Sequence, residues 1–140
     1  MDDELIDLLR TVASGFRMRL QEQVAASVSG LPEFQGRLIN LIARNEGISQ
    51  LSLASLTGRD KAQVARAIKE LEAHGFVTKS AHASDWRTQC LALTAKGRET
   101  HARLHDMRKK LGAAALSSLT HEEKHALKAC LSKVKLVLED

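Results

Sequence analysis

The stretch of residues 57–93 places the tightest constraint on how this chain can fold. A turn containing Gly58 is followed by Asp60, whose carboxylate can accept hydrogen bonds from the first amides of a helix that begins near Lys61. Apolar residues then recur at helical spacing and predict one buried stripe, formed by Val64, Ala67, Ile68 and Leu71. The opposite face is basic and polar. Gly75 ends the helix, and two short β-prone runs, residues 76–79 and 87–93, predict a β-hairpin with a polar tip next.

A chain of 140 residues and 15.4 kDa can form one domain with its own core, so we expect a single domain over residues 1–140. Its two cysteines, Cys90 and Cys130, lack C-x-x-C spacing and indicate neither a disulfide framework nor a thiolate zinc site. The N-terminus is acidic where a signal peptide is positive, and no apolar run approaches the roughly 18 residues needed to span a bilayer. We therefore expect a soluble, cytoplasmic protein with no membrane partner.

The net charge is +4, with an isoelectric point near 9.3, and the basic excess lies after residue 30. An excess this mild permits a polyanionic partner without requiring one, because ordinary soluble proteins reach such values. Charge alone therefore leaves both interpretations open.

A second short helix is predicted directly before the basic one. Ser49 is a good N-cap for it, and its apolar residues are Leu51, Leu53, Ala54 and Leu56. Two short helices joined by a tight turn, the second with a basic face, predict a helix-turn-helix, and a hairpin beside it is then a wing. A helical hairpin that binds no DNA, with an ordinary solvated hairpin tip behind it, is the alternative.

Long amphipathic helices are predicted at both ends of the chain. One covers residues 3–27, a second runs from Thr94 to about Leu116, and the last begins with Thr120 and Glu123 in capping-box register. Their apolar surface exceeds what a small domain covers alone, so we expect part of it to meet a second subunit. The residues expected at that interface are Leu5, Leu9, Leu111, Leu127, Leu131, Val134 and Leu138.

Residues 85–97 carry a recognisable pattern: D-W-R, three residues, then L-A-L-T-A-K-G. This pattern is similar to the D-x-R and the spaced apolar-x-Leu-Thr-x-x-Gly of the MarR (multiple antibiotic resistance regulator) family of winged-helix repressors. Further segments look like that family at the expected spacing, namely residues 47–49, 53–54, 63–66 and 71–77. Each motif is weak alone, but together and in order they indicate a resemblance over the whole chain.

The resemblance implies a winged helix-turn-helix that is mainly α with a small β-hairpin wing (α+β), with long dimerisation helices at both ends. Residues 31–93 would form the DNA-binding lobe, and residues 1–30 and 94–140 the helical dimerisation region. The implied function is a sequence-specific DNA-binding transcriptional regulator, not an enzyme and without a cofactor. It would act as a homodimeric repressor that a small aromatic or anionic effector releases from a pseudo-palindromic operator.

The residue types of the helix-turn-helix suit contacts with double-stranded DNA, since Gln matches adenine, Arg matches guanine and Ala can touch a thymine methyl. The residues expected to face bases are Lys61, Ala62, Gln63, Ala65 and Arg66. Ser49 and Gln50 are expected to reach phosphates at a helix start, and Lys69 and Lys79 by charge. At the wing, Arg87 would enter the minor groove, positioned by Asp85, with Trp86 at the tip.

The resemblance also implies an effector cavity. The residues expected to line it are Phe16, Arg17, Leu20 and Phe34, and packing in the core is the alternative role for the three apolar ones.

Other constellations suggest competing chemistry. The letters H-E-E-K-H at residues 121–125 spell the H-E-x-x-H zinc-protease motif, but that motif needs a third protein ligand and an enclosing cleft, so we reject a protease and assign no metal site. His101 and His105 leave a zinc-responsive member of the family open, with solvated histidines as the simpler interpretation. Oxidation sensing by Cys90 or Cys130, and an architectural DNA binder without sequence preference, also stay open.

Overall fold

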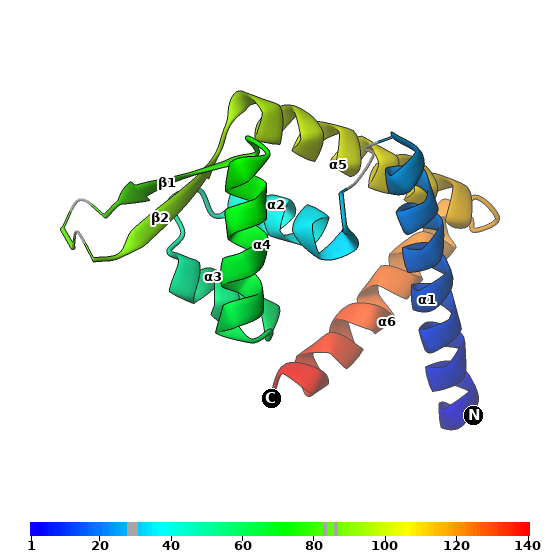
Figure 1. Ribbon diagram of the computed structural model, residues 1–140. Coiled ribbons are helices and arrows are strands. Elements are labelled where there is room, and N and C mark those ends of the chain that lie inside the picture. Colours follow the sequence, from blue (N-terminus) through cyan, green and yellow to red (C-terminus); the bar gives the residue numbers. More distant parts are fainter. Residues whose placement is uncertain (28–30, 83, 86) are drawn as a thin grey trace. The chain divides into compact units, whose positions relative to one another are not determined.

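The computed structural model describes residues 1–27, 31–82, 84–85 and 87–140 (Figure 1). Along the described chain the elements are α1 (Asp2–Ser27), α2 (Glu33–Arg44), α3 (Gln50–Thr57), α4 (Lys61–Ala73), β1 (Val77–Ala81), β2 (Gln89–Leu93), α5 (Ala95–Ala115) and α6 (His121–Glu139). The predicted fold, mainly α with a small β-hairpin, is confirmed.

The chain divides into two compact units. One unit is Leu20–Met107, and the other combines Met1–Arg19 with Arg108–Asp140. Both boundaries fall inside long helices, so α1 and α5 each contribute to both units. The predicted separation of a DNA-binding lobe from a dimerisation region stays a prediction.

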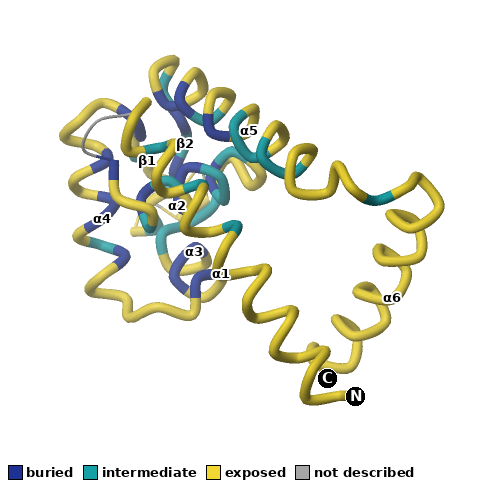
Figure 2. Tube along the Cα trace, turned by 90° about the vertical axis from the view of Figure 1, so that its right-hand side faces the viewer, coloured by how far each residue is buried: buried dark blue, intermediate teal, exposed yellow. Residues whose placement is uncertain are grey.

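The unit Leu20–Met107 contains the hydrophobic core. Its largest fully buried side chains are Leu38, Ile39, Ile42, Leu53, Ile68, Leu71, Leu91, Val64 and Val77. They come from α2, α3, α4 and the two strands, and Figure 2 shows buried positions on these elements and at the start of α5. Because each such side chain contributes about 1.5–3 kcal/mol when fully buried, this cluster holds the helix-turn-helix and the hairpin together.

The hairpin is attached to the link between α2 and α3. Its strands pair antiparallel, with Val77 opposite Leu93. The Gly47 amide donates to the Leu91 carbonyl at 2.9 Å, and the Leu91 amide donates to the Ile48 carbonyl at 2.9 Å. These bonds to β2 hold the hairpin against the segment that leads into α3.

The start of α5 is fastened to the end of α4 through Thr94 and Gly97. The Thr94 hydroxyl donates to the Gly75 carbonyl and accepts from the Gly97 amide at 3.0 Å. A Cβ on Gly97 would lie 2.1 Å from the Phe76 carbonyl oxygen, so only glycine permits this approach. The Thr-x-x-Gly part of the sequence pattern is therefore a joint between hairpin and helix.

The second unit leaves its apolar side chains uncovered. No described residue of α1 or α6 is buried, and both helices are coloured almost entirely as exposed in Figure 2. On α1, side chains between 37% and 65% exposed are Leu5, Ile6, Leu8, Leu9, Val12 and Met18. On α6, those between 39% and 80% exposed are Leu127, Leu131, Val134, Leu136, Val137 and Leu138. Among the described residues, no helix combines the length and apolarity that crossing a membrane requires.

Candidate nucleic-acid interface

Helix α3 begins at a cap formed by Ser49, as the sequence predicted. The Ser49 hydroxyl accepts from the Ser52 amide at 3.0 Å and donates to the Ser52 hydroxyl at 2.9 Å. The Ser49 hydroxyl is engaged in this way. The donors that suit a phosphate are therefore the first backbone amides of α3 rather than this hydroxyl, with half-buried Gln50 beside them. The exposed Ser52 was not predicted, although its spacing of three residues from a serine cap is a signal for it.

The turn between α3 and α4 also follows the predicted chemistry. Gly58 ends α3 with a φ of 66°, in the left-handed region that favours glycine. The Asp60 carboxylate then accepts from the Ala62 amide at 3.2 Å, and α4 begins at Lys61. The predicted stripe is buried toward the core: Val64, Ala67, Ile68 and Leu71. The cap and the stripe are both confirmed.

The opposite face of α4 presents positive charge and hydrogen-bond donors to solvent. Lys61, Ala62, Gln63, Arg66 and Lys69 are exposed, and Ala65 is half-buried. The carboxylate of Glu70 accepts a hydrogen bond from the buried Gln35 side chain of α2, which ties α4 to α2. The basic face is thus carried on a helix that is fixed from behind.

Asp85 organises the tip of the hairpin. Its carboxylate accepts from the Arg87 amide at 3.1 Å and from the Thr88 hydroxyl at 3.1 Å, and its carbonyl accepts from the Thr88 amide at 3.0 Å. The Arg87 Nε lies 3.8 Å from the Asp85 carboxylate, with the two side chains 78% and 52% exposed. Because an exposed pair contributes at most about 1 kcal/mol, the hydrogen bonds determine the turn. Trp86, predicted at the tip, lies outside the described residues.

Two basic residues that contact aromatic rings were not predicted. The guanidinium carbon of Arg59 lies 4.5 Å from the ring centroid of Phe34, which is half-buried against the core. Lys96 Nζ donates to the His74 carbonyl at 2.8 Å and lies 4.5 Å from the centroid of the Phe76 ring. These contacts join residues 20 to 25 positions apart, so helical periodicity does not predict them. The only sequence signal is the position of Arg59 next to the helix cap Asp60.

The residues predicted to line an effector cavity belong to different units. Phe16 and Arg17 lie in the unit that contains both termini, whereas Leu20 and Phe34 lie in the other. Phe16 and Leu20 are half-buried, and Arg17 is exposed. Their shared role stays a prediction.

Metal-ligating side chains do not gather in threes among the described residues: no group of three or more His, Cys, Asp or Glu is arranged to hold an ion. The His101 and His105 rings lie 6.2 Å apart between centroids. A zinc-responsive role for this pair stays a prediction, and so does oxidation sensing by Cys90, which is half-buried, or Cys130, which is exposed.

Comparisons with curated proteins identify helix-turn-helix regulators. The MarR family model matches residues 31–88. The HTH-type transcriptional regulator BilQ of Clostridium symbiosum is 34% identical over 93 residues, which cover 66% of this chain. The uncharacterized HTH-type transcriptional regulator YybA of Bacillus subtilis is 35% identical over 98 residues, which cover 70% of this chain. The matched region spans 65% of the length of each relative.

Solved structures share the fold along the whole chain. FabT of Streptococcus pneumoniae, in complex with DNA, has a TM-score of 0.90 at 17% identity, covering 100% of this chain and 99% of that one. A mutant MarR of E. coli, complexed with operator DNA, has a TM-score of 0.77 at 21% identity, covering 94% of this chain and 93% of that one. The family model, the named relatives and the fold agree: residues 31–88 form a winged helix-turn-helix of the MarR family, and the chain as a whole is similar to proteins of that family.

Proposed function

We propose that this protein is a sequence-specific DNA-binding transcriptional regulator. The observation that carries the proposal is the exposed basic face of α4, held on a helix-turn-helix whose turn, caps and core are all in place. The names of the curated relatives, and the DNA present in two solved structures of the same fold, support it.

In the proposed complex, the start of α4 lies in the major groove. Gln63 pairs with an adenine edge and Arg66 with a guanine edge, because each offers the matching two-point hydrogen bonds. Ala62 and Ala65 are small enough to touch thymine methyl groups, and Lys61 lies beside them at the helix start. These contacts specify the sequence.

Phosphate contacts hold the protein in register on the duplex. We assign them to Gln50 and the first amides of α3, with Ser49 as their cap, and to Lys69 and the half-buried Lys79. Arg87 enters the minor groove from the wing, in the position that the Asp85 turn gives it. We also assign a DNA contact to Trp86.

We further propose a homodimer built from the helices of the unit that contains both termini. The residues assigned to the interface are Leu5, Leu9, Leu111, Leu127, Leu131, Val134 and Leu138. The support is that α1 and α6 bury none of their described residues within one chain, which leaves their apolar stripes for another copy. Two-fold symmetry then places two half-sites about one helical turn, roughly 34–36 Å, apart.

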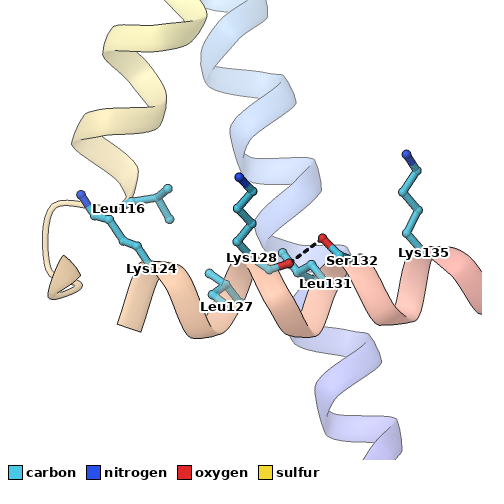
Figure 3. Close-up of a pocket in the computed structure, with 7 residues that line it drawn as sticks. All are labelled: Leu116, Lys124, Leu127, Lys128, Leu131, Ser132 and Lys135. Atoms are coloured by element: carbon cyan, nitrogen blue, oxygen red, sulfur yellow. Dashed lines mark hydrogen bonds between the residues drawn. The ribbon is translucent and has the colours of Figure 1, made fainter. Parts of the chain in front are cut away.

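A groove on α6 gives this interface a shape and a charge. Its volume is about 340 Å³, and its lining residues are Leu116, Lys124, Leu127, Lys128, Leu131, Ser132 and Lys135. Figure 3 shows the three lysines extending from one side of α6. The first turn of α1 is acidic, with Asp2, Asp3 and Glu4, so a second copy carries the opposite charge for these lysines.

The similarity to the MarR family supports the remaining parts of the proposal. The protein represses transcription in the cytoplasm, and a small aromatic or anionic compound releases it from its operator. Phe16, Arg17, Leu20 and Phe34 are assigned to the effector site. Screening aromatic acids for loss of operator binding, with Arg17→Ala as the variant expected to lose the response, tests this assignment.

Selection of bound sequences from a random duplex pool tests the DNA-binding function. We expect enrichment of one pseudo-palindromic sequence, bound about 10³-fold or more tightly than random duplex at the same salt concentration. Equal affinity for both duplexes would instead indicate an architectural binder without sequence preference. Absence of binding to any duplex at low salt would refute the proposed function.

A further inference from the structure

His121 and His125 lie one helical turn apart at the start of α6. Their Nε2 atoms share a hydrogen bond 3.0 Å long, their ring centroids are 4.4 Å apart, and the ring planes are nearly perpendicular, at 82°. Both residues are exposed. The two ring nitrogens therefore face each other at a position that solvent and small ions can reach.

We propose that this pair binds a divalent transition-metal ion such as Ni²⁺ or Cu²⁺, which takes the place of the proton shared by the two nitrogens. Imidazole nitrogens bind such ions at about 2.05 Å, and two nitrogens 3.0 Å apart then subtend about 94° at the ion. Both ring nitrogens are thus close enough to hold one ion between them after a small rotation of the rings.

The ligands are held on an ordered turn. The Thr120 hydroxyl accepts from the Glu123 amide at 3.1 Å, and the Glu123 carboxylate accepts from the Thr120 amide at 3.0 Å. This capping box fixes the backbone that carries both histidines, so little conformational freedom is lost when the ion binds. Glu122 and Lys124, which lie between the two histidines in the sequence, carry opposite charges. Because the described residues supply no third ligand, water completes the coordination and the ion exchanges readily.

A second pair on α5 provides a matched control. His101 and His105 have the same spacing in sequence, but their ring centroids lie 6.2 Å apart. These rings do not approach each other as closely as the α6 pair, at 4.4 Å, and the ion is assigned to the α6 pair alone. This site is independent of the proposed DNA contacts and of the rejected protease chemistry.

Titration of the tag-free full-length protein with Ni²⁺ tests the site by calorimetry. Ni²⁺ is the suitable probe because, unlike Cu²⁺, it does not oxidise the thiols of Cys90 and Cys130. We expect one Ni²⁺ per chain. Affinity should fall about tenfold or more in His121→Ala and in His125→Ala, because a single remaining ligand loses the effective concentration of the second.

The control variant His101→Ala/His105→Ala should bind Ni²⁺ as the wild type does. Circular dichroism establishes that all variants retain their helices. Three outcomes would overturn the proposal: no saturable binding by the wild type, full affinity in both α6 variants, or weakened binding in the α5 control.

Discussion

Asp85 places a negative charge on a surface that we propose faces a polyanion. Simple electrostatics would favour its absence, because each acid near the phosphates weakens binding. Its hydrogen bonds to the Arg87 amide and the Thr88 hydroxyl explain its presence, since they close the turn at the wing tip. At this residue, the geometry of the backbone outweighs the charge.

We therefore predict that Asp85→Ala weakens operator binding although it removes a negative charge. The turn opens, and Arg87 loses the position from which it reaches the minor groove. Fluorescence anisotropy with labelled operator measures the effect. Glu99→Ala, which removes an exposed acid on α5 in the same unit, is the matched control and should bind at least as tightly as wild type. Tighter binding by Asp85→Ala would contradict the assigned role.

Arg66 and Lys69 lie on the same exposed face, but their substitution should weaken DNA binding in different ways. Arg66→Ala is expected to cost about 1–3 kcal/mol on the operator and to relax base choice at one position. Lys69→Ala should weaken binding to all sequences evenly and reduce the slope of log affinity against log salt by about 1. Affinities for operator and random duplex at several salt concentrations separate the two. Identical behaviour of both variants would show that the face is assigned wrongly.

At the level of elements, local chemistry predicted where helices begin. The caps at Ser49, Asp60 and Thr120 depend on residues two or three positions apart, and each forms as expected. The predicted bounds of the two strands were less accurate. The first was predicted at residues 76–79 but is Val77–Ala81, because the Phe76 amide still donates to the Leu71 carbonyl at the end of α4.

The second strand begins at Gln89 rather than Arg87, because the Asp85 turn uses residues 87 and 88. Contacts between segments far apart in the sequence were not predicted at all. The Gln35 bond to Glu70 and the approach of Gly97 to Phe76 depend on how the helices are placed, which no local pattern encodes. The sequence therefore predicted the candidate face of α4 well and its supports poorly.

The joint between the hairpin and α5 leads to a prediction about stability. Gly97→Ala places a Cβ against the Phe76 carbonyl oxygen, and backbone must shift to admit it. We expect a loss of about 1–3 kcal/mol in the free energy of unfolding, measured by urea denaturation. Gly15→Ala, on α1, meets no atom within 4 Å and should not destabilise the protein. A Gly97→Ala variant as stable as wild type would show that the joint yields easily.

For the whole molecule, the two units differ in how they are stabilised. Leu20–Met107 has a buried core, whereas α1 and α6 expose rows of leucines and valines. A helix gains most of its stability in water from packing its apolar face. The second unit therefore depends on a partner surface, for which we propose a second copy.

Leu131→Glu tests this dependence. A carboxylate would interrupt the apolar stripe of α6 and compete with the acids of the second copy for the groove lysines, and the dissociation constant of the dimer should rise by about 100-fold or more. Light scattering measures the mass, and anisotropy should report weaker operator binding. Lys133→Glu adds the same side chain on α6 outside the groove lining and should leave the dimer intact. A Leu131→Glu variant that stays dimeric would place the interface elsewhere.

The uncovered stripes of α1 and α6 also matter before any partner is met. A newly made chain displays the apolar surface by which chaperones and proteases identify unfinished proteins. If the proposed dimer forms, the lifetime of the chain in the cell depends on how soon it finds another copy. The proposed dimer would thereby couple the abundance of the protein to its own assembly.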